Sequence, residues 1–326
     1  MADRLDVSIV VPTYNRRERL RVCLAALREQ DYDSSRYEII VSDDGSSDGT
    51  ADMVRSLPRD VPAIRYLGHE NIGPAASRNL GIKASIGRWV LFIDDDVEAE
   101  RGMVSAHVGA HLRGGNEKSF MLGYTPIALG RGDSPILRYV DRFWKRVYRR
   151  AAGQNPAQPW GLFITNNLSL RRDLLLDAGS FDEDFKGYSY EDSELGYRLM
   201  QRGMAVRFLP GARAVHHVRL DLEGCCSQAY RAGRSAVVFW RKHPELLTVL
   251  SIPSARRYQG PGRLPRWRRI ARDAVYNESV VRWLASLIGG STPHASMAIS
   301  HLLLDIVLWH HTVTGMNDEL KQGGGR

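Results

Sequence analysis

Three consecutive aspartates, Asp94, Asp95 and Asp96, end a short apolar run in the stretch RWVLFIDDDVE, residues 88–98. An apolar run of this length, bounded by Gly87 and by charges, is typical of a strand buried on both faces. Such a strand would deliver its carboxylates to the edge of a sheet, where open α/β folds bind ligands. Adjacent carboxylates with no Lys or Arg near them repel one another, and a divalent cation would neutralise them. An acidic turn that exposes its charge to water is the alternative interpretation.

Three further segments place polar residues where they can join these aspartates: PTYN at 12–15, DDGSSD at 43–48 and GYSYEDSELGYRL at 187–199. We expect all of them at strand ends, and the C-terminal ends of parallel strands share one edge of a sheet. At that edge Asp44 can accept a hydrogen bond from a nucleobase N–H, and Tyr14 can stack on a base or ribose. Each segment alone also fits an ordinary turn, because Asp, Gly and Ser are common turn residues.

The first two-thirds of the chain alternates strand and helix patterns. Strands are predicted at 7–11 (ended by Pro12), 38–41, 64–67, 89–93, 206–209 and 214–218, and helices at 17–30, 75–85, 136–150 and 192–202. This alternation predicts an α/β fold, with a mostly parallel Rossmann-like sheet and helices on both faces.

The last third has a helical pattern throughout, with helices predicted at 226–242, 264–288 and 296–314. We therefore predict two domains, an α/β domain over residues 1–219 and a basic helical extension over 220–326. The apolar stretch 295–309 contains His301 and Asp305 and is too short to span a bilayer.

The composition is that of an ordinary globular protein, with 43% hydrophobic and 25% charged residues among 326. The three cysteines, Cys23 and the adjacent Cys225 and Cys226, form neither a disulfide framework nor a metal-ligand spacing. They indicate a reducing, cytoplasmic setting. The N-terminus leads directly into the first predicted strand, so we expect no signal peptide.

Positive charge is concentrated near the C-terminus. The net charge is +8, and residues 256–272 contain seven arginines and no acid. Such a patch fits nucleic acid, a phosphorylated acceptor or an anionic membrane surface, which would make the protein peripheral to the cytoplasmic membrane face. A solvated helical face is the simpler interpretation.

Five segments together resemble family 2 glycosyltransferases: VSIVVPTYNRRERL, EIIVSDDGSSDGT, NIGPAASRNLGIKASIGRWVLFIDDD, LSLRRDLLLDAGSFDEDF and YEDSELGYRLMQRG. The resemblance covers residues 5–217. It implies the GT-A fold and an inverting transfer of a sugar from a nucleotide diphosphate donor to a hydroxyl group. Because members of the family commonly use UDP-sugars, the resemblance implies a UDP-sugar donor. The acceptor it implies is a glycan, a lipid-linked sugar or a small molecule.

The resemblance also implies which residues bind the donor. Asp44 would recognise the base, Arg78 would reach the nucleotide, and Asp95 would contact the ribose or the sugar. The residues that it assigns to the donor are Pro12, Thr13, Tyr14, Asp43, Asp44, Arg78, Asp94 and Asp95.

Asp94 and Asp96 match the DxD pair that binds Mn²⁺ or Mg²⁺ in the family, with Asp96 the direct ligand. His216 matches a histidine that completes the metal site in some members, and a histidine ligand favours Mn²⁺. If His216 and His217 lie on a strand, their side chains point to opposite faces, so one of the two can serve the site.

Asp192 matches the catalytic base, with Glu191 in support. The spacing of Asp192 with Leu195 and Leu199 places it in the first turn of a helix, whose dipole favours the carboxylate form. An ordinary helix cap is the alternative role. Other polar or aromatic residues that can contact donor or acceptor are Tyr188, Tyr190, Trp160, Asn166 and Asn167.

Two other classes of protein fit less well. A nucleotidyltransferase would show a glycine-rich basic loop after the first strand, and PTYNRRERL has no glycine. A nucleic-acid-binding protein would interleave aromatics with the C-terminal arginines, where Tyr258 and Trp267 alone qualify.

Overall fold

The computed structural model describes residues 5–58, 62–113, 117–130, 132–153, 158–186, 189–250, 252, 278–289 and 297–322. The arginine-rich segment 256–272 and Tyr188 lie outside the described residues, as does most of the helix predicted at 264–288.

The chain divides into two compact units. Unit 1 comprises Met1–Ala128, Phe143–Lys186 and Glu191–Val218, and unit 2 comprises Leu129–Arg142, Gly187–Tyr190 and Arg219–Arg326. The last boundary falls one residue before the predicted one, whereas two earlier segments that we placed in the α/β domain group with unit 2.

Unit 1 is built on an eight-stranded sheet with the order β3-β2-β1-β4-β7-β6-β8-β5. Its strands are β1 (Val7–Thr13), β2 (Tyr37–Asp43), β3 (Ala63–Gly68), β4 (Trp89–Ile93), β5 (Val97–Ala99), β6 (Ser119–Tyr124), β7 (Asn167–Arg171) and β8 (Ala205–His216). The pairs β1–β2, β2–β3, β1–β4 and β6–β8 are parallel. β7 is antiparallel to β4 and β6, and β5 is antiparallel to β8.

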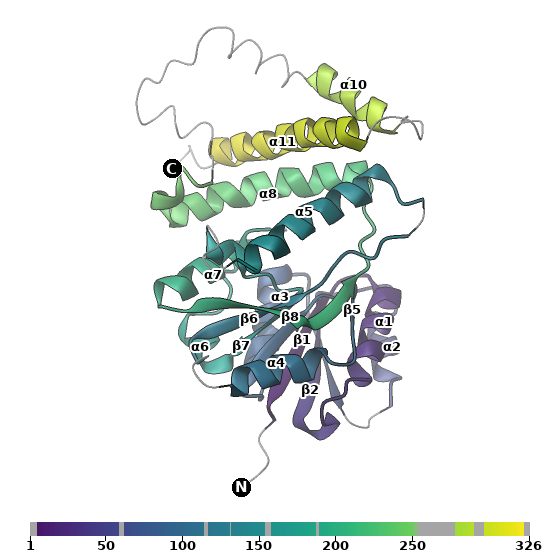
Figure 1. The fold of residues 1–326 in the computed structure, drawn as a ribbon, viewed down its shortest axis with the longest axis vertical. Helices are drawn as coiled ribbons and strands as arrows, with labels where there is room; N and C mark the ends of the chain where they lie inside the picture. Colours follow the sequence, from purple (N-terminus) through teal and green to yellow (C-terminus); the bar gives the residue numbers. More distant parts are fainter. Residues whose placement is uncertain are drawn as a thin grey trace. The chain divides into compact units, whose positions relative to one another are not determined.

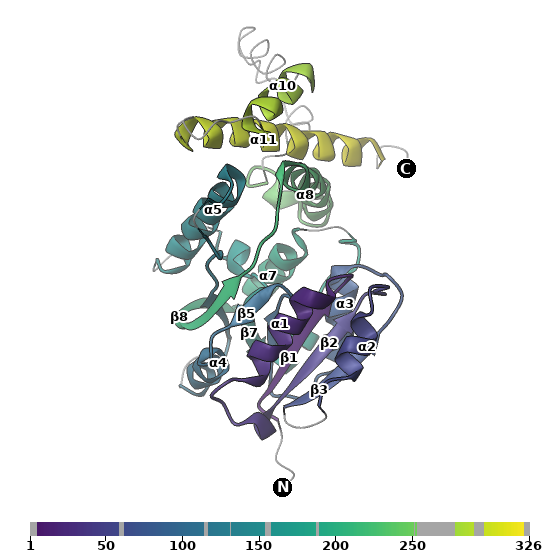
Figure 2. The ribbon, with the colours of Figure 1, turned by 90° about the vertical axis from the view of Figure 1, so that its right-hand side faces the viewer.

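Helices cover both faces of this sheet (Figures 1 and 2). They are α1 (Arg17–Arg28), α2 (Thr50–Arg55), α3 (Pro74–Ala84), α4 (Met103–Leu112), α6 (Arg172–Asp177) and α7 (Glu191–Gln201), with 3₁₀ turns at Ser34–Arg36 and Pro159–Leu162. Successive side chains of β1 point to opposite faces of the sheet. On one face, Ile9 packs in a core with Leu24 of α1. On the other face, Val10 packs in a core with Ile82 of α3 and Leu195 of α7. The predicted α/β architecture is confirmed.

Two details of the sheet differ from the predictions. Pro12 lies inside β1 instead of ending it. Because the pairing of β4 with β1 ends at Val10, the N–H group that proline lacks is not needed for a hydrogen bond to β4. The strands predicted at 206–209 and 214–218 are one strand, β8. A register shift opposite Gly123 and Tyr124 absorbs the residues between them.

α5 (Pro135–Ala151) has the bounds that its apolar spacing predicts to within one residue. Its first half belongs to unit 2 and its second half to unit 1. In unit 1, Val147, Tyr148 and Ala151 form a small core with Leu122 and Leu162.

Unit 2 contains α8 (Leu222–Lys242), α10 (Glu278–Gly289) and α11 (Met297–Gln322), with a 3₁₀ turn at Pro244–Leu246. α8 and α11 pack backbone to backbone, because a Cβ at Gly233 would lie 1.9 Å from the carbonyl oxygen of Thr312. An ion pair of 2.8 Å between Arg234 and Glu319 adds to this contact. Within the described residues, the longest helices lack a stretch apolar enough to cross a membrane.

Candidate active site

The aspartates follow β4, whose five residues are all buried, as predicted. Asp95 is buried, and its carboxylate accepts hydrogen bonds from Thr13 Oγ1 (2.8 Å) and Arg16 Nη1 (3.0 Å). Burial raises the pKa of Asp95 to about 6 against the opposing charge of Arg16. The Thr13 hydroxyl therefore donates its hydrogen bond to Asp95.

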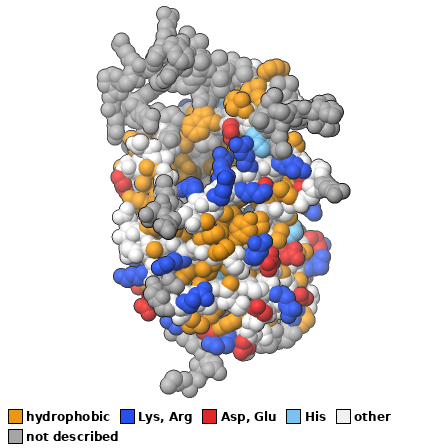
Figure 3. All heavy atoms as spheres, viewed as in Figure 1, with side chains coloured by type: hydrophobic (Ala, Val, Ile, Leu, Met, Phe, Trp, Pro, Cys, Tyr) orange, Lys and Arg blue, Asp and Glu red, His pale blue; other side chains and the backbone are white. Residues whose placement is uncertain are grey.

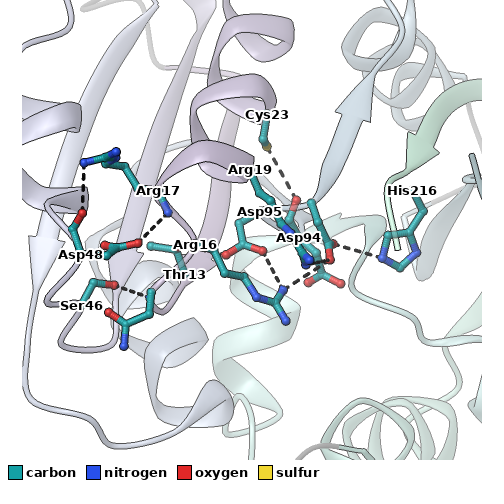
Figure 4. Close-up of polar contacts among 12 residues, drawn as sticks. Thr13, Arg16, Arg17, Arg19, Cys23, Ser46, Asp48, Asp94, Asp95 and His216 are labelled. Atoms are coloured by element: carbon teal, nitrogen blue, oxygen red, sulfur yellow. Dashed lines mark hydrogen bonds and ion pairs between the residues drawn. The ribbon is translucent and has the colours of Figure 1, made fainter. Parts of the chain in front are cut away.

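Both carboxylate oxygens of Asp96 have partners. Oδ1 lies 3.1 Å from Nε2 of His216, and Oδ2 lies 3.3 Å from Arg19 and 3.4 Å from Arg16. Figure 4 labels these three partners. Burial would raise the pKa of Asp96, but the hydrogen bond from His216 and the arginine charges together lower it. Of the two adjacent histidines, His216 faces Asp96, and His217 turns away to Glu98, 2.7 Å distant.

Arg78 of α3 connects the aspartates to the acidic pair of α7. Its guanidinium lies 3.2 Å from Asp94 and 3.2 Å from Glu191, and the side chain is buried. Two distant motifs thus meet through one cation. The side chain that was expected to reach the nucleotide is already held between two carboxylates.

These contacts correct one premise of the sequence analysis. The aspartates do have arginines beside them, namely Arg16, Arg19 and Arg78. Neutralisation of the cluster therefore does not by itself require a metal ion.

Asp192 lies in the first turn of α7, not at a strand end. Its carboxylate accepts hydrogen bonds from the backbone N–H (3.0 Å) and the hydroxyl (2.9 Å) of Thr165. Thr165 precedes β7, whose first residue Asn167 pairs with Ile93 at the end of β4, so Asp192 is held at the same edge of the sheet. Burial raises the pKa of Asp192, and Arg78 opposes this shift.

Glu191, the neighbour of Asp192, has one side-chain oxygen, Oε2, that is buried with no hydrogen-bond partner in the described part of the chain. Burial and the charge of Asp192 raise the pKa of Glu191 to about 7. The two residues before it, Ser189 and Tyr190, have positive φ angles of 87° and 70°. Such backbone conformations are unusual for residues other than glycine and cluster at functional sites.

Asp44 is buried at the end of β2, and its carboxylate accepts hydrogen bonds from the backbone N–H groups of Ile72 (2.7 Å) and Gly73 (3.1 Å). It therefore fixes the loop before α3 in addition to any contact with a base. Tyr14, in contrast, is 47% exposed and free to stack on a ligand.

Asp43 is fully buried, and its two oxygens accept hydrogen bonds from the backbone N–H of Ser46 (2.9 Å) and the hydroxyl of Tyr66 (2.7 Å). Asp43 thus holds the loop after β2 in place, and its assignment as a donor contact stays a prediction.

The residues expected near the acceptor fall into two groups. Trp160 and Tyr190 pack edge-on or tilted against Tyr197 and Phe239, so their rings serve packing. Asn166 is buried, and both polar atoms of its amide lack a hydrogen-bond partner among the described residues. The Tyr148 hydroxyl lies close enough to Asn166 for the amide to affect its pKa, so a contact of Asn166 with a substrate hydroxyl stays a prediction.

A buried histidine network was not predicted. Nε2 of His107, on α4, lies 2.8 Å from Asn167 Oδ1, and its Nδ1 lies 2.8 Å from Ser169 Oγ, which also contacts Nε2 of His111. Burial lowers the pKa of His107 to about 4, so the ring is neutral. This network fixes β7 next to Thr165. The i, i+4 spacing of the two histidines was the signal available in the sequence.

The residues at the end of β4 fit a divalent cation whose ligands come partly from the protein and partly from a bound substrate. No three His, Cys, Asp or Glu side chains are arranged to hold a metal ion by themselves in the described ranges. Asp96 and His216 nevertheless offer a carboxylate oxygen and an imidazole nitrogen 3.1 Å apart. Mg²⁺ and Mn²⁺ sites commonly use one or two such side chains and complete their coordination with phosphate oxygens.

Among curated proteins, validoxylamine A glucosyltransferase of Streptomyces hygroscopicus subsp. jinggangensis (strain 5008) is 32% identical over 275 residues, which cover 75% of this chain and 62% of that protein. The uncharacterized glycosyltransferase YfnE of Bacillus subtilis (strain 168) is 27% identical over 274 residues, covering 65% and 64%. The chain thus spans less than two thirds of the length of these relatives.

Among solved structures, the mannosyltransferase PcManGT from Pyrobaculum calidifontis in complex with GDP-Man and Mn²⁺ aligns with a TM-score of 0.60 at 18% identity, covering 99% of this chain and 89% of that chain. S. aureus TarS 1-349 in complex with UDP aligns with a TM-score of 0.52 at 16% identity, covering 99% and 93%. These similarities confirm the expected GT-A fold. The family model described as Glycosyl transferase family 2 matches residues 8–177, and the chain belongs to that family.

Proposed function

We propose that the protein is a metal-dependent, inverting glycosyltransferase that moves a sugar from a nucleotide diphosphate donor to an acceptor hydroxyl. One observation carries this proposal: Arg78 links the aspartates after β4 to the acidic start of α7, with 3.2 Å contacts to Asp94 and Glu191. A cation-binding carboxylate cluster and a candidate base thereby share one edge of the sheet.

In this proposal each residue has a separate task. A divalent cation held by Asp96 and His216 would offset the charge that develops on the departing nucleoside diphosphate. Asp192, fixed by Thr165, removes the proton of the acceptor hydroxyl as the sugar is transferred. Arg78 remains between the two sites and keeps their carboxylates at a fixed separation. Inversion follows when the hydroxyl attacks from the side opposite the diphosphate.

The donor nucleotide is proposed to be UDP, with GDP as the alternative to test. The solved relatives support a comparison of the two, since one was obtained with GDP-Man and the other with UDP. Tyr14, with its exposed ring, and Asp44 are the residues proposed to contact the base and the ribose.

The donor pocket is tested by replacing Asp44 with Asn. The amide keeps one oxygen for the loop N–H groups and loses the charge that would bind a base N–H. We expect the affinity for UDP with Mn²⁺ to fall by roughly 1.5–3 kcal/mol, the value of a charge-assisted hydrogen bond, while the melting temperature stays near that of the wild type. Calorimetry measures the affinity, and unchanged UDP binding would remove Asp44 from the donor site.

On the acceptor side, we infer contact with an anionic surface from α5. Its exposed basic side chains lie on one side of the helix and are Arg142, Lys145, Arg146, Arg149 and Arg150. Figure 3 shows Lys and Arg side chains gathered over this helix. A helix with a basic face and an exposed aromatic such as Phe143, 48% exposed, is suited to anionic lipid. This supports a lipid-linked acceptor in preference to a soluble one.

Vesicle flotation tests this inference. Each Lys or Arg near an anionic surface contributes about 1 kcal/mol, so changing Arg146 and Arg149 to Glu should release the protein from phosphatidylglycerol vesicles at low salt. A control with Arg21 and Arg55 changed to Glu carries the same net charge and should still float. Equal binding of the wild type to neutral and anionic vesicles would reject the inference.

A further inference from the structure

The guanidinium of Arg16 contacts the carboxylates that would bind a divalent cation. Its Nη1 lies 3.0 Å from Asp95 Oδ1 and 3.4 Å from Asp96 Oδ2, and Arg19 Nη1 lies 3.3 Å from the same Asp96 oxygen. The remaining Asp96 oxygen contacts His216. A divalent cation that binds Asp96 must therefore displace a guanidinium or lie against one, and like charges at that distance repel.

The backbone on either side of Arg16 is fixed. The N–H of Asn15 donates to Ser46 Oγ (2.7 Å). The N–H of Arg17 donates to Asp48 Oδ2 (2.9 Å; Figure 4). Asn15 holds a positive φ of 51° in this arrangement. The Arg16 side chain, in contrast, is 47% exposed. The guanidinium can therefore leave the aspartates by side-chain rotation, without a change of fold.

A diphosphate is the partner that suits a displaced Arg16. If the donor shares the cation with Asp96, its phosphate oxygens lie next to the carboxylates that Arg16 now contacts. Phosphate oxygens offer a guanidinium the same charge-assisted, paired hydrogen bonds as a carboxylate. Arg78 cannot serve equally well, because it is buried and held by Asp94 and Glu191.

We propose that Arg16 is a ligand of the donor diphosphate and that, before the donor binds, it neutralises the aspartates of the cation site. This inference rests on the proposed function. It predicts that the cation alone binds weakly, since it must displace Arg16 with no new partner for the guanidinium. Cation and donor together bind tightly, because the diphosphate receives Arg16. By linkage, each raises the affinity for the other by the same factor.

The test measures Mn²⁺ binding through the electron paramagnetic resonance signal of free Mn²⁺, first alone and then with UDP or GDP. For Arg16→Gln we expect Mn²⁺ alone to bind roughly five- to tenfold more tightly than to the wild type, and the enhancement of Mn²⁺ binding by the nucleotide to fall roughly tenfold or more. Arg16→Lys keeps the charge but lacks the planar pair of donors. Its Mn²⁺ affinity and its enhancement by the nucleotide should lie between those of the wild type and those of Arg16→Gln. Arg21→Gln removes an exposed arginine of α1, the helix that begins directly after Arg16. Arg21 pairs with Glu18, and this variant should match the wild type.

The outcomes separate the inference from the proposed function. If Arg16→Gln and Arg21→Gln show the same Mn²⁺ affinity and the same enhancement by the nucleotide, the proposed role of Arg16 is overturned. Nucleotide binding by the wild type would in that case still support the proposed function. Tighter Mn²⁺ binding with full nucleotide enhancement would show that Arg16 only neutralises the aspartates, which also overturns it. A folded wild type that binds neither nucleotide with Mn²⁺ would reject both.

Discussion

Replacing Asp192 with Asn is expected to lower the rate of sugar transfer by a factor on the order of 10² or more while leaving donor binding intact. The carboxylate is held by Thr165 from a neighbouring segment, with hydrogen bonds of 3.0 and 2.9 Å. Its position is thus fixed independently of the substrate. An amide fills the same space but cannot take the proton of the acceptor hydroxyl, so the loss falls on the chemical step.

Two comparisons separate this role from a purely structural one. Asp192 is the second residue of α7 and bonds Thr165, so its structural role is to hold Thr165 in place. Asn keeps an oxygen that accepts from Thr165, and a purely structural Asp192 therefore predicts that the variant keeps its activity. Asp173→Asn, in the first turn of α6, changes a carboxylate at an equivalent helical position away from the site and should leave the rate unchanged. Glu191→Gln should lower the rate less than Asp192→Asn. Single-turnover kinetics measure these effects, and an active Asp192→Asn enzyme would transfer the role of base to Glu191.

Removal of divalent cations should abolish transfer, and Mn²⁺ or Mg²⁺ should restore it. A metal ion that stabilises charge on the leaving group is worth several kcal/mol, or roughly 10³-fold in rate. Asp96→Asn should show a loss of this size that added metal does not rescue. The amide preserves the shape of the side chain, so thermal unfolding should show that the variant is folded.

The chain contains its own control for this prediction. His217 and Glu98 form a second histidine–carboxylate pair, 2.7 Å apart, beside the pair of His216 and Asp96. His216→Ala should weaken Mn²⁺ binding and transfer, whereas His217→Ala should change neither. Full activity after dialysis against EDTA would contradict a metal-dependent mechanism.

The sequence predicts the elements of this fold well because local patterns determine them. The run Trp89–Ile93 is observed as a strand with the predicted bounds, and α1 buries Leu20, Leu24 and Leu27 as its spacing requires. The polar segments that were predicted to meet at one edge of the sheet do contact one another. Thr13 contacts Asp95, and Asn15 contacts Ser46. Arg78 joins Asp94 to Glu191. Boundaries that depend on a partner strand were not predictable, as at Pro12 inside β1.

The electrostatics of the site depended on contacts between residues far apart in the chain. Arg78 reaches Glu191 across 113 positions, and Arg16 reaches Asp95 across 79. Sequence reasoning placed the aspartates at the sheet edge but treated them as free of arginines, because it considered neighbours along the chain only. The choice of His216 over His217 likewise required the register of β8 against β5.

The most direct test of the account is the release of nucleoside diphosphate from a panel of UDP- and GDP-sugars by the full chain with Mn²⁺. Slow hydrolysis of a bound donor needs no acceptor, so the measurement does not depend on knowing one. We predict release from at least one donor at a rate well above the enzyme-free background, abolished by EDTA and by Asp96→Asn and unaffected by His217→Ala. Release from no donor, by a folded protein that also fails to bind UDP or GDP, would contradict the assignment of this site as a glycosyltransferase centre.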